Sequence, residues 1–242
     1  MARRRFFVDR ISGGMAELAG DDARHLTRVL RVEAGQIFEI SDNRSAYVAE
    51  VVEARGPRVV FRVLEPLAAA AAPVEITLCA ALIKFDRFEW IIEKATELGV
   101  ARIVPVETTR TEKGLFTAAE KRRERWIRIA RESSQQSRRI SAPEICAPVR
   151  FAASLETAAG VRLFLEEATA PPILQTLNGT AATVALLLGP EGGWTDAERD
   201  SAARAGWQAV SLGPQILRAE TAAVAALAVV MNAGTAARTT MD

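Results

Sequence analysis

Hydrophobic and polar positions alternate over short segments in the first quarter of the chain. The segments "QIFEIS", "AYVAEVV" and "RVVFRVL" lie between residues 36 and 64 and are separated by Asp-Asn and Gly-Pro turns. Alternation with a period of two over runs of this length is typical of strands with one buried face. We therefore predict a small β domain in residues 1–72.

Strand and helix patterns alternate after the proline-bounded alanine run "EPLAAAAAPVE" (residues 65–75), which we take as the boundary between two domains. Five segments have the composition of buried strands: "EITLCAALI", "RIVPVE", "VRLFLEE", "TVALLLG" and "WQAVSLG". Strands that alternate with helices favour a parallel sheet covered on both faces. Residues 73–242 are therefore predicted to form an α/β domain.

The helices of this second domain carry start and stop signals. The segment 86–99 places apolar residues on one face and Gly99 at the position after the helix end. Thr117 with Glu120, and Thr195 with Glu198, have the spacing of capping boxes. We expect the helix after Thr195 to end near Gly206, and the last helix to run over residues 221–232.

Two Leu-Gly-Pro turns follow apolar, strand-like runs, in "LLLGPEGGWTDAE" (residues 186–198) and "SLGPQILRAETA" (residues 211–222). In open parallel sheets, ligands bind outside the carboxyl ends of the strands, where helix N-termini present free N–H groups. The two turns are therefore expected to form one ligand site. Neither turn fits the glycine-rich patterns for NAD or nucleoside triphosphates, which disfavours both ligands.

Composition narrows the classes of function. A chain of 242 residues with 49% hydrophobic residues can bury a full core. The distant Cys79 and Cys146 and the single His25 disfavour a zinc site, a disulfide framework and a Ser-His-Asp triad. Asp9 and Arg10 interrupt the basic start before a signal-peptide core forms, and the run "AAVAALAVVM" stops short of the ~20 residues of a membrane span. We expect a soluble cytoplasmic protein that binds neither metal nor membrane.

Charge is unevenly distributed although the net charge is only +1. The basic excess lies in residues 84–139, which include the run "EKRRERWIRIARESSQQSRR". This run has two interpretations that stay open: a phosphate-facing patch, or a solvated helix with Glu-Arg pairs. Arg24, Arg28 and Arg31 would line one face of the first domain if "DARHLTRVLR" is helical.

Five motifs together carry a resemblance to a known family: "HLTRVLR", "KFDRFEWIIEKATELGV", "RIVPVETTRTEKG", "LLLGPEGGWTDAE" and "LGPQILRAETAAVAAL". In this order and spacing, the chain resembles the RsmE family of 16S ribosomal RNA uridine-N3 methyltransferases, in the SPOUT superfamily. The resemblance implies a PUA-like β-barrel that binds RNA, followed by a SPOUT-type parallel α/β domain with a deep C-terminal trefoil knot. It also implies S-adenosylmethionine as cofactor and a homodimer. Pattern reasoning would argue against the knot, because threaded chains are rare.

The resemblance also implies roles for individual residues. Leu212, Ile216 and Leu217 would line the adenine pocket, and the glycines would let the loops close over the cofactor. The implied cofactor-binding residues are Leu165, Glu166, Leu188, Gly189, Pro190, Glu191, Gly192, Gly193, Leu212, Gly213, Gln215, Ile216, Leu217 and Arg218. The implied RNA-binding residues are Arg24, Arg28, Arg31, Arg110, Arg138 and Arg139.

Methylation of uridine N3 removes a proton and leaves negative charge on the flanking oxygens, which a cation would stabilise. Arg218 is the first candidate for that cation and Arg110 the second, while Glu191 is a third catalytic candidate. Alternatives stay open: Arg218 could pair with Glu220, Glu191 could cap a helix, and Arg110 could bind phosphate. Trp194 could receive the flipped base or pack in the core.

One departure from the family pattern lies at residues 135–139. The family tends to read E-Q-S-G-R there, and this chain reads "QQSRR", so that Arg138 stands in the place of the glycine. The resemblance predicts an S-adenosylmethionine-dependent methyltransferase that acts on N3 of a uridine in 16S ribosomal RNA of the small subunit. The alternatives are a related SPOUT enzyme that acts on another RNA site, and a non-catalytic RNA-binding protein of ribosome assembly.

Overall fold

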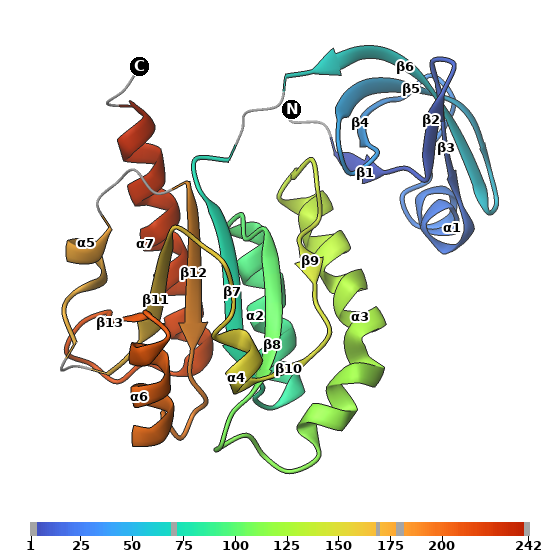
Figure 1. Cartoon of the computed structure of the whole chain (residues 1–242). Helices are drawn as coiled ribbons and strands as arrows, with labels where there is room; N and C mark the ends of the chain where they lie inside the picture. The colour runs from blue at the N-terminus through green and yellow to red at the C-terminus, as the bar shows by residue number, and fades with distance from the viewer. Residues whose placement is uncertain (1–3, 69–71, 168–169, 178–181, 240–242) are drawn as a thin grey trace. The chain divides into compact units, whose positions relative to one another are not determined.

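The computed structural model describes residues 4–68, 72–167, 170–177 and 182–239 (Figure 1). The chain divides into two compact units. The first comprises Met1–Ala71 and Arg131–Ala142, and the second comprises Ala72–Ala130 and Pro143–Asp242. The predicted division at residue 72 did not anticipate that residues 131–142 belong with the first unit. The alanine run of the predicted boundary lies partly outside the described residues.

The first unit contains a six-stranded sheet and one helix. Its elements are β1 (Arg5–Phe7), β2 (Arg10–Ser12), β3 (Met15–Ala19), α1 (Gly20–Arg28), β4 (Ile37–Ser41), β5 (Ala46–Arg55) and β6 (Arg58–Leu67). The strand order is β1-β4-β5-β6-β3-β2; β1 pairs with β4 in parallel, and the other pairs are antiparallel. The three predicted strands are confirmed as β4, β5 and β6. Their inward residues pack with Ala23 and Leu26 of α1 in one core.

Helix α1 is shorter than the motif "DARHLTRVLR" allows. It ends at Arg28, and Arg31 has a φ of 51° beyond the helix. Arg31 therefore does not share a helical face with Arg24 and Arg28. Within α1, Arg24 Nε donates to Asp21 Oδ1 at 3.0 Å.

The second unit is an α/β fold on a parallel sheet. Its strands are β7 (Glu75–Ala81), β8 (Arg102–Glu107), β9 (Glu144–Ile145), β10 (Val149–Arg150), β11 (Val161–Leu165), β12 (Thr183–Leu188) and β13 (Gln208–Val210). They lie in the order β10-β8-β7-β12-β11-β13, with β9 on β8, and every pair is parallel. The five predicted strands are confirmed; the short β9 and β10 were not predicted.

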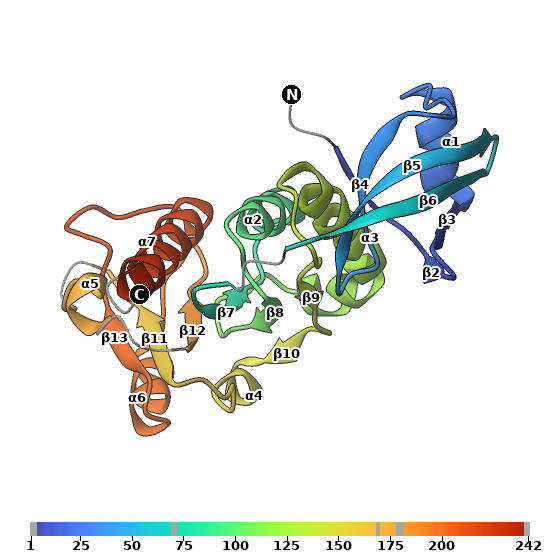
Figure 2. The same cartoon turned by 90° about the horizontal axis from the view of Figure 1, so that it is seen from above.

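Helices cover both faces of this sheet, as Figure 2 shows. The helices that begin in this unit are α2 (Phe85–Glu97), α3 (Leu115–Gln136), α4 (Phe151–Ser154), α5 (Ile173–Thr176), α6 (Asp196–Arg204) and α7 (Ala219–Thr239). Helices α2 and α7 lie on one face, with α4 and α6 on the other. Along β12, Leu186 packs in the core beside α2 and α7, and Leu187 packs in the core beside α6. Both faces of β12 are therefore buried, which explains its uninterrupted apolar sequence.

The predicted helix boundaries are partly confirmed. Gly99 follows α2 with a φ of 91°, a conformation that favours glycine, and the Thr195–Glu198 capping box opens α6. The box predicted at Thr117 is wrong, because α3 begins two residues earlier, at Leu115, and Thr117 lies inside it. Helix α7 is longer at both ends than predicted, since the Ala and Thr residues around the apolar run are compatible with a helix.

The apolar part of helix α7 is longer than the run "AAVAALAVVM" that the sequence analysis compared with a membrane span. By length and composition alone, Ala219–Ala237 could cross a membrane, because uncharged residues extend the apolar run. The core helix of a globular protein can meet the same criterion. In this fold α7 contacts α2 and β12, and Ala223, Ala226, Leu227 and Val230 are buried in the core.

The end of α3 has a strained residue. Arg138 lies just beyond the helix with a φ of 56°, the left-handed region that disfavours residues with a Cβ. This is the position where the family pattern places glycine. The chain therefore adopts a glycine conformation with an arginine, at an expected cost of about 1 kcal/mol.

Arg138→Gly should raise the free energy of unfolding by about 1 kcal/mol, because glycine adopts this conformation without strain. Chemical denaturation of both proteins measures the difference. Arg128→Gly is the control: Arg128 is exposed inside α3, where glycine should lower stability by about 1 kcal/mol. A lower stability for Arg138→Gly would show that the conformation costs nothing.

Candidate functional site

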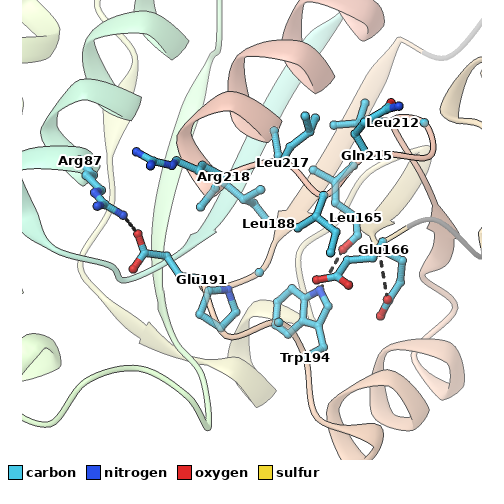
Figure 3. A pocket seen from close by; sticks show the side chains of 18 of the residues that line it. Arg87, Leu165, Glu166, Leu188, Glu191, Trp194, Leu212, Gln215, Leu217 and Arg218 are labelled. Atoms are coloured by element: carbon cyan, nitrogen blue, oxygen red, sulfur yellow. Dashed lines mark hydrogen bonds and ion pairs between the residues drawn. The ribbon is translucent and has the colours of Figure 1, made fainter.

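Three loops leave the sheet at the carboxyl ends of the adjacent strands β11, β12 and β13 and enclose a cavity of about 370 Å³ (Figure 3). All of the predicted cofactor-binding residues except Gly192 line this cavity. They are Leu165, Glu166, Leu188, Gly189, Pro190, Glu191, Gly193, Leu212, Gly213, Gln215, Ile216, Leu217 and Arg218. The two Leu-Gly-Pro turns therefore line one cavity, and the binding of a ligand there stays a prediction.

Six further residues line the cavity without having been assigned to it: Arg87, Glu167, Trp194, Arg199, Ala219 and Ala222. Ala219 and Ala222 follow the second turn directly, in the first turns of α7. Arg87 comes from the first turn of α2, about a hundred residues earlier in the chain. Its place in the site depends on how α2 packs, which no local sequence signal reveals.

Trp194 connects two of the loops. Its indole Nε1 donates to the Leu165 carbonyl at 2.9 Å, and its ring stacks on Phe164 with centroids 4.6 Å apart. A Cβ on Gly189 would lie 2.9 Å from the indole, so only glycine fits there. The tryptophan is 3% exposed, which leaves no open ring face for a flipped base. Of the two interpretations of Trp194, the structure supports core packing.

Glu198 connects a fourth loop, the one after β8, to the site. One carboxylate oxygen accepts from the backbone N–H of Thr109 at 2.8 Å, and the other accepts from Thr195 N at 2.9 Å. Burial by itself would raise the pKa of the Glu198 carboxyl, but these backbone hydrogen bonds and those from the threonine hydroxyls outweigh it and lower the pKa. The sequence indicated only the capping box; the contact with Thr109 lies 89 residues away and was missed.

Arg110 follows Thr109 and contacts the glycine turn from outside the cavity. Its Nη1 donates to the Gly192 carbonyl, and a Cβ on Gly192 would lie 3.2 Å from the arginine Cδ. Arg110 itself is not among the cavity-lining residues. Its contact therefore fixes the conformation of the loop rather than placing a cation inside the cavity.

Ion pairs lie at two places around the cavity. Arg87 Nη1 pairs with Glu191 Oε1, and Arg199 Nε pairs with Glu166 Oε1 at 2.6 Å. Thr195, not Glu191, caps α6, so the capping alternative for Glu191 is wrong. The Glu166 side chain is only 11% exposed, and Glu167 lies beside it. The cavity lining thus carries three carboxylates, Glu166, Glu167 and Glu191, and three arginines. Of the arginines, Arg87 and Arg199 are paired, and Arg218 is the third.

Arg218 has no ion pair within the ranges that the structure describes. Its expected alternative partner, Glu220, has a buried Oε2 without a hydrogen-bond partner among the same residues. The Arg218–Glu220 pair is therefore not formed. Arg218 is exposed at the mouth of the cavity, where a ligand can reach its guanidinium.

The predicted RNA-binding arginines fall into both units. Arg24, Arg28, Arg31, Arg138 and Arg139 belong to the first unit, and Arg110 to the second. Arg139 is half-buried and donates to the Ser141 carbonyl at 3.1 Å, and burial lowers the pKa of its guanidinium to about 10. It is the least accessible of the six. Arg28 and Arg31 are exposed and available to phosphate groups, whereas the exposed Arg24 is paired with Asp21.

The basic run in α3 contains both arginines that are paired with glutamate and basic residues that are exposed. Arg122 and Arg125 both bind Glu89 of α2, at 3.0 and 2.8 Å. Hydrogen bonds from Arg125, and then from Arg122, lower the pKa of the Glu89 carboxyl against the opposing effect of burial. Lys121 and Arg128 of the same helix are exposed, and no contact that the structure describes occupies them. Part of the run is thus held in Glu-Arg pairs, and part of it faces solvent.

Metal ligands are not clustered in the described part of the chain. No group of three or more His, Cys, Asp and Glu residues there could hold a metal ion. Burial raises the pKa of the Cys79 thiol to about 11, so this cysteine is protonated at neutral pH. The charged side chains that line the cavity are arginines and glutamates.

Comparison with known proteins adds sequence relatives. Residues 70–231 match the family described as RNA methyltransferase domain, and residues 18–64 match the RNA methyltransferase PUA domain. A Synechocystis protein named ribosomal RNA small subunit methyltransferase E is 37% identical over 84% of this chain and 68% of its own length. A protein of the same name from Aquifex aeolicus is 29% identical over 94% of this chain and 98% of its own length.

Two solved structures are similar to this chain over almost its whole length. A Legionella pneumophila methyltransferase in complex with SAM has a TM-score of 0.88 and 29% identity, covering 96% of this chain and 98% of that one. Ribosomal RNA small subunit methyltransferase E from Neisseria gonorrhoeae, bound to S-adenosylmethionine, has a TM-score of 0.87 and 29% identity, covering 95% and 97%. The predicted α/β fold with a parallel sheet and an N-terminal PUA-like domain is confirmed. The trefoil knot stays a prediction.

Glu198→Gln should destabilise the protein in a pH-dependent way. Because the folded protein lowers the pKa of Glu198, its stabilising effect is complete above the ordinary glutamate value of about 4.3 and is lost as the pH falls through the folded value. Denaturation between pH 7 and pH 3 should give a stability difference from the parent that shrinks below about pH 4.3. Glu156→Gln, at an exposed site, is the control. A difference that stays constant over this range would refute the role of the charge.

Proposed function

Because this chain belongs to the RNA methyltransferase family, we propose that it transfers a methyl group from S-adenosylmethionine to N3 of a uridine in 16S ribosomal RNA. The relatives named ribosomal RNA small subunit methyltransferase E confirm the resemblance to the RsmE family. The observation that carries the proposal is the three-loop cavity beyond β11, β12 and β13. It occurs in a chain that aligns over almost its whole length with two SAM-bound structures.

The cavity suits S-adenosylmethionine in size and in chemistry. A volume of about 370 Å³ lies within the usual range for small-molecule sites. Leu165, Leu188 and Leu212 offer apolar surface to the adenine, and backbone groups of the loops offer hydrogen bonds to its edge. Glu166 and Glu167 offer acceptors to hydroxyl and ammonium groups. We assign these residues to the cofactor.

S-adenosylmethionine bound in this cavity would supply a methyl group on a positively charged sulfur. Methyl transfer is an in-line displacement, so holding the two reactants in alignment contributes much of the rate. The methyl C–S bond would break as the N3–C bond forms, which leaves S-adenosylhomocysteine, and the N3 proton is released to solvent. As N3 loses its proton, negative charge develops on the two flanking oxygens. Arg218 stabilises that charge, because its guanidinium lines the cavity and no ion pair in the described ranges neutralises it.

Glu191 and Arg110 support this site in different ways. Glu191 directly follows the first Leu-Gly-Pro sequence and lies in the cavity lining, where its carboxylate pairs with Arg87. Arg110 holds the Gly192 carbonyl through one guanidinium nitrogen and leaves its other N–H groups for a phosphate of the RNA. We assign Arg110 to loop positioning and RNA binding.

The first unit is assigned to RNA binding. It matches the RNA methyltransferase PUA domain, and Arg24 and Arg28 lie exposed on its helix α1. Phosphate contacts of this kind supply affinity that falls as the salt concentration rises. We place the protein in the cytoplasm with its substrate, the small ribosomal subunit or its 16S RNA.

The product of the reaction tests the proposed function. The protein should transfer a labelled methyl group from S-adenosylmethionine to 16S RNA in excess EDTA, because no metal site is needed for the displacement. Mass spectrometry of the digested RNA should find the methyl group on the uracil base. Methylation of a ribose or of transfer RNA would point to another SPOUT activity, and RNA binding without transfer would point to a ribosome-assembly protein.

Arg218→Ala should lower the rate of methyl transfer about 100-fold at saturating S-adenosylmethionine and RNA. The affinity for S-adenosylmethionine should change much less, because the charge that Arg218 meets develops only in the transition state. Single-turnover kinetics and calorimetry measure the two effects. An equal loss of rate and of cofactor affinity would assign Arg218 to cofactor binding instead.

The protein is proposed to form a homodimer through α7. No charged residue lies between Glu220 and Arg238, and Ala228 is exposed while Val224 and Ala225 are only half-buried. An uncharged helix face of this length is expected to be covered by a partner, and most such assemblies are two-fold dimers of identical chains.

Light scattering at micromolar concentration should give twice the chain mass of 26.2 kDa. Ala228→Arg should shift the protein toward the monomer, because it places a charge on the exposed face of α7 without changing the core. A monomer mass for the parent protein would rule out the dimer. A dimer that tolerates Ala228→Arg would place the interface elsewhere.

A further inference from the structure

Two carboxylates lie close to Arg218 in sequence or in the cavity, and neither pairs with it. Glu220, two residues along the chain, has its Oε2 buried without a hydrogen-bond partner in the described part of the protein. Glu191 lines the same cavity as Arg218 but pairs with Arg87. An exposed arginine beside a carboxylate ordinarily forms an ion pair, because their attraction is appreciable at a few ångströms. The unpaired state of Arg218 therefore has a structural cause.

Arg87 is placed to be that cause. It lies in the first turn of α2, an element separate from the three loops, and its side chain reaches the cavity. Figure 3 shows the Arg87 guanidinium bound to Glu191, with the Arg218 guanidinium extended toward the same side of the cavity. The side chains of Arg87 and Glu191 are 34% and 42% exposed, so both keep some freedom to choose partners.

We propose that Arg87 is a positioning residue of the methyl-transfer reaction. By holding the Glu191 carboxylate, it prevents Glu191 from pairing with Arg218, and Arg218 stays available to the oxygens of the target base. This inference rests on the proposed role of Arg218. Without Arg87, Glu191 pairs with Arg218, and the RNA base has to displace the carboxylate before its developing charge can be stabilised.

The proposal predicts a modest effect that depends on another residue. Half-exposed ion pairs contribute up to about 1 kcal/mol, which corresponds to about a fivefold change in rate. Arg87→Ala should therefore slow methyl transfer about fivefold. The dissociation constant for S-adenosylmethionine should change less than twofold, because the cofactor is bound before charge develops on the base.

A double-mutant cycle separates this role from a merely structural one. Transfer rates at saturating S-adenosylmethionine and RNA are measured for the parent, R87A, R87K, E191Q and the double variant R87A/E191Q. R87K keeps a cation opposite Glu191 and should retain most of the rate. In the E191Q background the carboxylate that Arg87 holds away from Arg218 is absent, so adding R87A should have no further effect. R102A, which breaks the 2.8 Å Arg102–Glu144 pair on the distant strands β8 and β9, is the matched control and should transfer at the parent rate.

The outcomes distinguish failure of the proposed role of Arg87 from failure of the proposed role of Arg218. If R87A slows transfer equally with and without E191Q, Arg87 acts independently of Glu191 and the inference is overturned. R218A is measured in the same assay. If R218A transfers at the parent rate, the proposed role of Arg218 fails, and this inference fails with it. If R218A is slow while R87A matches the parent, only the role of Arg87 is rejected.

Discussion

The hydrogen bond from the Trp194 indole to the Leu165 carbonyl is the contact on which the cavity depends. It joins the loop after β11 to the loop after β12, and both ends are buried. The same indole lies against Gly189, where a Cβ would clash with the ring. The Trp194 ring and the absence of a side chain at Gly189 therefore set how closely the two loops approach each other. A buried carbonyl that loses its donor is costly, which makes the arrangement strongly preferred. This contact therefore sets the spacing of the two loops that shape the cavity.

The carboxylates around the Trp194 contact are held by hydrogen bonds and ion pairs. Glu198 binds backbone N–H groups of two loops, Glu166 binds Arg199, and Glu191 binds Arg87. These contacts occupy the carboxylates that could otherwise neutralise a nearby cation. Arg218 remains unpaired within the described residues, at the mouth of the cavity. An unpaired guanidinium in a preformed site needs little rearrangement when charge develops on a substrate, which is how preorganised electrostatics lower a barrier.

Local patterns predicted the parts of the fold that depend on neighbours in sequence. The strands, Gly99 after α2 and the Thr195–Glu198 box follow from periodicity and capping, and the Leu-Gly-Pro turns follow from the rule for parallel sheets. Local patterns misplaced some helix boundaries, such as the start of α3, and they missed the features that depend on distant contacts. Arg87 enters the cavity through the packing of α2, and Glu198 binds Thr109 of another loop. Residues 131–142 join the first unit because Arg131 binds Phe7 and Asp22 there, which no local pattern contains.

Replacing Trp194 tests the central claim, that this indole holds the cofactor cavity in shape. Trp194→Phe keeps an aromatic ring but removes the N–H that binds the Leu165 carbonyl. Trp207→Phe is the matched control, since Trp207 is also buried and donates to a leucine carbonyl, Leu155, away from the cavity. Calorimetry with S-adenosylmethionine in EDTA should show affinity about tenfold weaker for Trp194→Phe, equivalent to about 1.4 kcal/mol, and unchanged for Trp207→Phe. Equal affinities for the parent and both variants would contradict the account.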